Sequence, residues 1–178
     1  MFEAIVIIAI LIAVAIAAVL ILAATKPEVF RVQRSIMVKA PPDAIFALIS
    51  DFHQWRKWSP YEDRDPDLKR SYSGADNGKG AVYAWEGNKN VGSGRMEILE
   101  AAAPAKIVIK LDFFTPFEAH NTAEFTMLPQ GDATHVIWLM HGPAPFMNKV
   151  MQVVMNLDRM IGRDFETGLA NLKRLTEK

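Results

Sequence analysis

Hydrophobic residues near the C-terminus recur at three- and four-residue steps, which is the spacing of one face of a helix. No proline interrupts the run after Pro145. We therefore predict one long amphipathic helix from Phe146 to Lys178, roughly 50 Å in length at 1.5 Å per residue. Its apolar stripe, which needs a broad apolar partner, consists of Met147, Val150, Met151, Val154, Leu157, Ile161, Phe165, Leu169, Leu172 and Leu175.

The middle of the chain instead alternates between apolar and polar residues, as half-buried strands do. The short links between these segments favour antiparallel hairpins. Two short helices, over 42–49 and 52–58, are expected after the first strand, where prolines interrupt the alternation. The predicted strands cover residues 30–38, 68–72, 81–86, 94–100, 106–114, 117–128 and 134–141. The fold class is α+β: a curved antiparallel sheet of about seven strands around the long C-terminal helix.

The N-terminal segment has a third pattern. Ala4–Ala24 is 21 consecutive residues without a polar side chain, and thirteen of them are Ile, Val or Leu. This length matches a bilayer span, and insertion of thirteen such residues is favourable by roughly 4 to 8 kcal/mol. A cleaved signal peptide is the alternative, but no Lys or Arg precedes the run and the cleavage site is weak. We predict a transmembrane anchor over 1–26 and a soluble domain over 27–178.

Charges beside this segment predict its orientation. Lys26, Arg31 and Arg34 follow the apolar run, whereas only Glu3 precedes it. Positively charged residues tend to stay on the cytoplasmic side of a membrane. We expect a single-pass membrane protein whose soluble domain lies in the cytoplasm.

Composition excludes several classes of function. The chain has 20 Lys and Arg against 20 Asp and Glu, so no excess of positive charge indicates a nucleic-acid partner. Without cysteine it has no disulfide, thiolate metal site or cysteine nucleophile. The four histidines form no metal motif, because His135 and His141 share a strand face but lie roughly 20 Å apart. We expect no metal and no cofactor.

Several short motifs occur in a characteristic order through residues 28–178. They are Ser35–Pro41, Ile45-Phe46, Ser50–Phe52 with Trp55 and Trp58–Pro60, Gly80 with Tyr83, Trp85 and Gly87, Thr134–Trp138, and Gly162–Lys173. In these features the chain resembles the START-like, or SRPBCC, superfamily, and most of all its polyketide cyclase/dehydratase-type members. The resemblance implies a helix-grip fold with a deep apolar cavity, in proteins that usually bind lipids, sterols, polyketides or other hydrophobic molecules.

The residues expected to line such a cavity lie on inward faces of the predicted strands and helices. They are Trp58, Tyr83, Trp85, Ile109, Phe113, Asn121, Phe125, Trp138, Met140, Met151, Met155 and Phe165. Apolar and aromatic walls with a few polar groups are typical of ligand pockets. The alternative for each residue is that it fills a core, which is the commoner fate of large apolar residues.

Two inward-phase residues are polar. Asn121 lies among apolar positions, so it either bonds the protein backbone or meets a ligand, and we favour the backbone. Arg34 is in phase with Ile36 and Val38, and it is either an inward cation or a strand-end surface residue. We favour the surface for Arg34, because long cationic side chains usually reach water.

Three functions remain open. The first is membrane-anchored binding or transport of a hydrophobic, lipid-like small molecule between sheet and helix. The second is a cyclase- or dehydratase-type enzyme, for which Asn121, Tyr83 and Arg34 are the only candidate groups and no catalytic set is evident. The third is a protein-interaction module like the activators of the Hsp90 chaperone, which would need a large exposed apolar patch.

Overall fold

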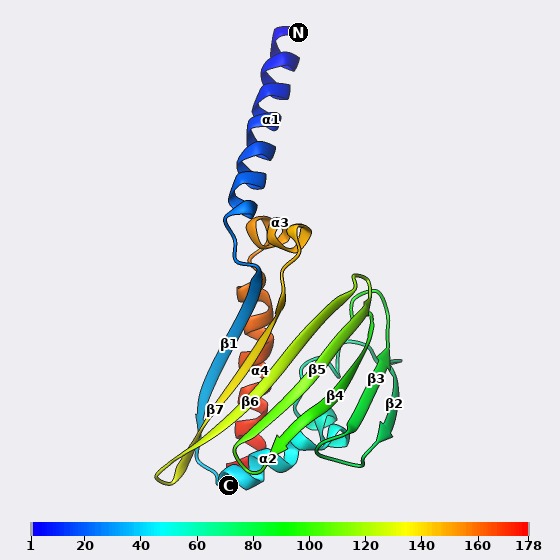
Figure 1. The fold of residues 1–178 in the computed structure, drawn as a ribbon, viewed down its shortest axis with the longest axis vertical. Helices are drawn as coiled ribbons and strands as arrows, with labels where there is room; N and C mark the ends of the chain where they lie inside the picture. Colours follow the sequence, from blue (N-terminus) through cyan, green and yellow to red (C-terminus); the bar gives the residue numbers. More distant parts are fainter. Residues whose placement is uncertain (1, 178) are drawn as a thin grey trace.

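The computed structural model describes residues 2–177, and Figure 1 shows its elements in space. The N-terminal helix, the first strand, two short helices, six further strands and the C-terminal helices follow in the predicted order. Their bounds are α1 Phe2–Ala24, β1 Val29–Val38, α2 Pro42–Ser50, the 3-10 helix η1 Phe52–Lys57, β2 Lys69–Gly74, β3 Ala81–Glu86, β4 Ser93–Ala102, β5 Lys106–Thr115, β6 Ala119–Gln130, β7 Ala133–Pro143, α3 Phe146–Val154 and α4 Leu157–Thr176.

The seven strands form one antiparallel sheet in the order β1-β7-β6-β5-β4-β3-β2. Six consecutive strands follow one another as a meander, and only β1 pairs out of sequence, with β7. The pairing of Arg34 with Trp138 and of Ile36 with Val136 sets the register of β1 against β7. The predicted helix-grip architecture is confirmed: the sheet curves, and α4 crosses its concave side (Figure 1).

Alternation along each strand places one set of side chains inside. On β7 the even-numbered residues from Thr134 to Gly142 are buried, and on β6 the odd-numbered residues from Asn121 to Met127 are buried. Each inward set packs against α4, α2 or η1, and each outward set is polar or half-exposed. This two-residue period is the signal that allowed the strands to be predicted from the sequence.

The predicted single helix over 146–178 is wrong in one respect, because the chain breaks it at Met155 and Asn156. Met155 has an extended backbone, and the Asn156 side chain accepts a hydrogen bond from the Arg159 N–H at 2.9 Å. Asparagine is among the residues that best cap a helix N-terminus, so a new helix starts at Leu157. Figure 1 shows α3 lying crosswise to α4, next to α1.

Helix α4 approaches the sheet closely because two of its contact positions are glycines. A Cβ at Gly162 would lie 2.0 Å from Nη2 of Arg34, and one at Gly168 would lie 2.8 Å from Cζ3 of Trp138. The same face buries Phe165, Leu169 and Leu172, in the i, i+4, i+7 pattern of a core-facing stripe.

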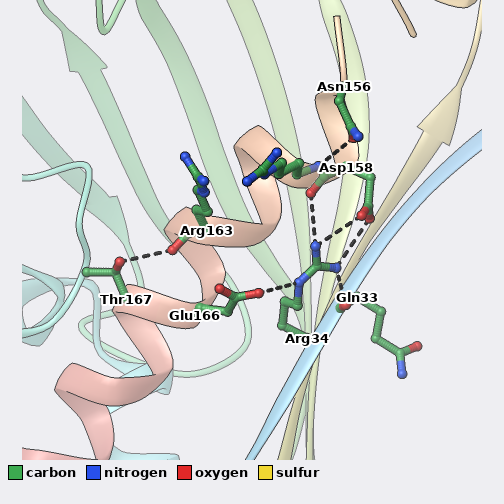
Figure 2. A network of polar contacts seen from close by, with 8 residues as sticks. Gln33, Arg34, Asn156, Asp158, Arg163, Glu166 and Thr167 are labelled. Carbon is green, nitrogen blue, oxygen red and sulfur yellow. Dashed lines mark hydrogen bonds and ion pairs between the residues drawn. The ribbon is translucent and has the colours of Figure 1, made fainter. Parts of the chain in front are cut away.

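Figure 2 shows the polar contacts that fasten the start of α4 to β1. The Arg34 guanidinium donates to both carboxylate oxygens of Asp158, at 3.2 and 3.0 Å, and to Glu166 Oε1 at 2.8 Å. It also donates to the backbone oxygens of Asp158 and Gln33. The expectation that Arg34 is a strand-end surface residue is therefore wrong: it faces α4, where two carboxylates compensate its charge.

The end of α4 fastens to the same strand. Lys173 Nζ donates to the Met37 carbonyl at 2.8 Å, and the Lys39 N–H donates to Glu177 Oε1 at 2.7 Å. Because β1 is an edge strand, these contacts occupy backbone groups that could otherwise pair with another chain.

Helix α1 extends away from the rest of the chain (Figure 1). It is long and apolar enough to cross a membrane, by length and composition. Most of its side chains are exposed, and Ala23 is the buried residue in its described length.

We predict that Arg34→Met lowers the free energy of unfolding by about 1–2 kcal/mol. The substitution keeps the bulk of the side chain but removes a two-pronged ion pair whose carboxylates are more than half exposed, which limits the loss. Arg34→Lys should recover part of this lost stability, because lysine keeps the positive charge but lacks the planar, forked set of N–H donors of arginine. Denaturant unfolding followed by tryptophan fluorescence measures both; equal stability of Arg34→Met and the natural chain would contradict the assigned role.

Candidate functional site

Aromatic rings fill the space between the sheet and α4. Trp138 of β7 stacks on Phe165 of α4, with ring centroids 4.0 Å apart and planes 6° from parallel. Phe125 lies 4.8 Å from Trp138, and Trp58 meets Phe125 edge-on at 6.0 Å. Trp55 of η1 extends the cluster by a contact with Trp58 at 4.7 Å. Strands, short helix and long helix therefore all meet in one aromatic interior.

Most of the predicted lining residues lie in or beside this interior. Those buried within it are Trp58, Tyr83, Ile109, Phe125, Trp138, Met140 and Phe165, and Asn121 is buried beside it. Trp85 and Phe113 are partly buried and pack against it, with their rings 5.7 Å apart. Met151 and Met155 lie elsewhere, on α3 and at the helix break, and Met155 is 43% exposed. The break in the predicted long helix removes these two methionines from the sheet.

One tryptophan has an unused hydrogen-bond donor. Trp55 Nε1 donates to the Ile49 carbonyl at 2.9 Å, and Trp58 Nε1 donates to the Leu48 carbonyl at 3.1 Å. Trp138 Nε1 is buried and has no partner among residues 2–177. A buried N–H without a partner costs free energy, so this position is suited to an acceptor atom brought by a ligand.

A buried carboxylate lies at the β2–β3 end of the interior. The Tyr83 hydroxyl donates to Glu62 Oε1 at 2.8 Å, and Arg70 Nε donates to Glu62 Oε2 at 2.6 Å. Burial, with the nearby Glu62, raises the pKa of Tyr83, so the phenol stays protonated and acts as a donor. Glu62 and Arg70 were not predicted as site residues. The need of a buried tyrosine hydroxyl for a partner was the only signal that could have found them.

The other two polar candidates differ: the protein holds the Arg34 side chain, whereas no hydrogen bond of the Asn121 side chain is found among residues 2–177. Asn121 is 9% exposed and lies against Gly142 of β7, where a Cβ would come within 2.2 Å of its Oδ1. Arg34 is occupied by Asp158 and Glu166. Of the three groups considered for an enzyme, two are thus bound to carboxylates.

Two cavities in the described chain lie away from the aromatic interior. One, of about 270 Å³, is bounded by Lys26, Gln152, Val153 and Asn156–Asp158, where α1, α3 and α4 meet. The other, of about 300 Å³, lies at the sheet end where β1 begins and β7 ends. The predicted site residue Asn121 and Gly142 line it together with outward residues of β5, β6 and β7. The aromatic rings pack against one another, so a guest molecule would have to separate them.

The second cavity contains paired charges. His120 Nδ1 lies 2.8 Å from Asp112 Oδ1, and Lys110 Nζ lies 3.0 Å from Asp112 Oδ2. The hydrogen bond to Asp112 raises the pKa of His120 above its ordinary value. Burial acts to raise the pKa of Asp112, but hydrogen bonds to His120 and Lys110 outweigh it and lower that pKa. Within residues 2–177 no group of three or more His, Cys, Asp or Glu residues is arranged to hold a metal ion.

Residues 29–177 match the family described as polyketide cyclase / dehydrase and lipid transport. The chain belongs to this family. The match begins where β1 begins and ends at Glu177, so α1 lies outside the family domain. No curated protein matches the chain.

Solved structures share the family fold at low sequence identity. The di-domain aromatase/cyclase BexL of the BE-7585A biosynthetic pathway matches with a TM-score of 0.62 and 12% identity, over 88% of this chain and 53% of BexL. The Aha1 dimer from Colwellia psychrerythraea matches with 0.60 and 13%, over 83% and 96%. Protein CV1439 from Chromobacterium violaceum matches with 0.58 and 15%, over 86% and 99%. At these identities the likeness shows the fold alone.

We predict that His120 titrates above about pH 6.5, its ordinary pKa. A raised folded-state pKa gives stability that is fully present below about pH 6.5 and is lost as the pH rises through the folded value. Asp112→Asn should therefore destabilise the chain more at about pH 5.5 than at about pH 8.5, and should lower the His120 pKa. An NMR titration of the imidazole protons measures the pKa of His120 in the natural chain and in Asp112→Asn. An unchanged titration midpoint in Asp112→Asn would refute the pairing of His120 with Asp112.

Proposed function

We propose that this chain is a membrane-anchored protein that binds a hydrophobic, lipid-like small molecule between the sheet and α4. The observation that supports it most directly is the unpartnered Trp138 Nε1 inside an otherwise apolar, aromatic interior. The family description includes both cyclases and lipid transport, which agrees with a hydrophobic guest. A carbonyl, hydroxyl or carboxylate oxygen of that guest would accept the free indole N–H.

Admission of the guest requires the stack between sheet and helix to open. Trp138 and Phe165 share one face-to-face contact, and Gly168 leaves no side chain between the Trp138 ring and the α4 backbone. Displacing Phe165 from Trp138 would open space beside the indole nitrogen. The guest would then make apolar contacts in place of the ring–ring contacts. Little apolar surface would therefore become exposed to water when the interior opens.

A membrane anchor would hold this interior close to the bilayer, where hydrophobic molecules are concentrated. Membrane-soluble molecules reach a tethered protein without crossing bulk water, and tethering raises their effective concentration. We propose that residues 1–26 are the anchor and 27–178 the binding domain.

Fluorescence can test the binding, because all four tryptophans lie in or against the interior and α1 has none. We predict that a fatty acid carrying bromine on its chain quenches the full-length protein saturably in lipid nanodiscs, and that unbrominated fatty acid reverses the effect. Trp138→Phe should weaken binding by up to about tenfold through loss of one hydrogen bond.

Trp55→Phe is the matched control. Trp55 is not a predicted lining residue and its N–H already donates to the Ile49 carbonyl, so this substitution should leave the affinity of the probe within about twofold. Absence of saturable quenching in the natural chain would overturn the proposed function. Equal affinities of the Trp138→Phe and Trp55→Phe variants would remove the assigned role of Trp138.

The proposal also includes an orientation. Lys26 and Arg31 follow α1, whereas the acidic Glu3 lies in its first turn, so we place the domain in the cytoplasm. A reporter active only in the cytoplasm, fused after Lys178, is expected to be active. Activity of a reporter that works only outside the cytoplasm would reverse this assignment.

A further inference from the structure

Helix α3 lies where α1 meets the folded domain. It connects β7 to α4, and Figure 1 shows it crosswise at the base of α1. Ala23, near the end of α1, is fully buried at this junction. If α1 spans a bilayer, α3 is at the level of the lipid headgroups and runs along the membrane surface.

Contacts through Glu28 hold α3 in this position. Glu28 lies in the link between α1 and β1, and its backbone oxygen accepts the Ala144 N–H at 2.8 Å. Its carboxylate pairs with Lys149, whose side chain is 7% exposed. One residue thus joins the exit of α1 to the link between β7 and α3 and to the middle of α3, which restricts rotation of α3 about its axis.

The other side of α3 exposes large apolar side chains. Met147 and Val154 are 69% and 68% exposed, and they project from the same side of the helix because seven residues make two turns. Further exposed apolar residues accompany them at both ends of α3 and in the first turn of α4: Phe146, Met155 and Met160. Lys26, at the end of α1, adds a positive charge beside this surface, which favours anionic lipid headgroups.

We propose that α3 is an interfacial helix, whose exposed face around Met147 and Val154 is immersed among the lipid headgroups and upper acyl chains. The inference rests on membrane anchoring by α1, which the proposed function includes. A short helix with one apolar face lying flat in the interface is a known mode of membrane contact. With α1 upright and α3 flat, the domain has two contacts with the bilayer, and these fix which end of the sheet faces the lipid.

The bilayer is the occupant we favour over a protein partner because the surface is continuous with α1. Helix α3 is in direct contact with α1, and both helices expose large apolar side chains, so one lipid phase would cover both. The Met147 and Val154 side chains bury much less apolar surface than the 21-residue apolar run of α1 would, so α3 orients the domain while α1 retains it.

Single cysteines provide the test, since the natural chain has none. The full-length chain is reconstituted in vesicles of neutral and anionic phospholipid with a nitroxide on Met147→Cys or Val154→Cys. Leu11→Cys in α1 is the lipid control, and Leu128→Cys near the opposite end of β6 is the water control. All four natural residues are at least 43% exposed, so the labels should not disturb the fold. Accessibility to oxygen, which concentrates in lipid, is compared with accessibility to a water-soluble nickel complex.

We expect the Met147→Cys and Val154→Cys labels to resemble Leu11→Cys, with oxygen favoured, whereas Leu128→Cys favours nickel. If the labels at 147 and 154 favour nickel while the Leu11→Cys label favours oxygen, α3 is not an interfacial helix. The membrane anchor would still be supported by that result. Low accessibility to both reagents at 147 and 154 would show a covering protein surface and would also refute it. Nickel accessibility at Leu11→Cys would instead refute the anchor itself.

Discussion

The close contact of α4 with β1 and β7 is the constraint on which the rest of the fold depends. Two glycines allow the helix backbone to reach the Arg34 guanidinium and the Trp138 ring, and Phe165 stacks on that ring between them. Side chains at either glycine would collide with these groups. The contact closes the concave side of the sheet, and it also determines how much room remains for anything else.

The same contact explains why the interior is both well packed and incomplete. Ring–ring contacts satisfy the apolar surfaces of Trp58, Phe125 and Trp138, but an indole nitrogen needs an acceptor that none of these rings supplies. Glu62, by contrast, is buried with two donors and is internally complete. The Trp138 indole nitrogen therefore lacks the internal partner that the buried charge of Glu62 has.

The two ends of the domain have different surroundings. At one end the exit of α1, α3 and the start of α4 lie together and expose apolar side chains, while at the other the β6–β7 turn lies far from α1 (Figure 1). A domain anchored only by a flexible link could face the bilayer in any direction. The Glu28–Lys149 contact restricts that freedom, and so couples α1 to the orientation of the family domain.

Periodicity along the chain was sufficient to predict the strands, the short helices, the apolar N-terminal helix and the α+β class, because burial of one face imposes a period of 2 or 3.6 on the residues themselves. It also indicated which aromatic residues face inward.

Periodicity did not predict the break at Asn156, because the capping bond competes with a helical pattern that continues on both sides. Nor did it predict the partners of Arg34 and Tyr83, which lie 132 and 21 residues away in the chain. Which surfaces are buried was determined by the sequence. Which buried groups meet, and which are left without a partner, was decided only by the tertiary structure, because such contacts depend on distances between elements that no local pattern encodes.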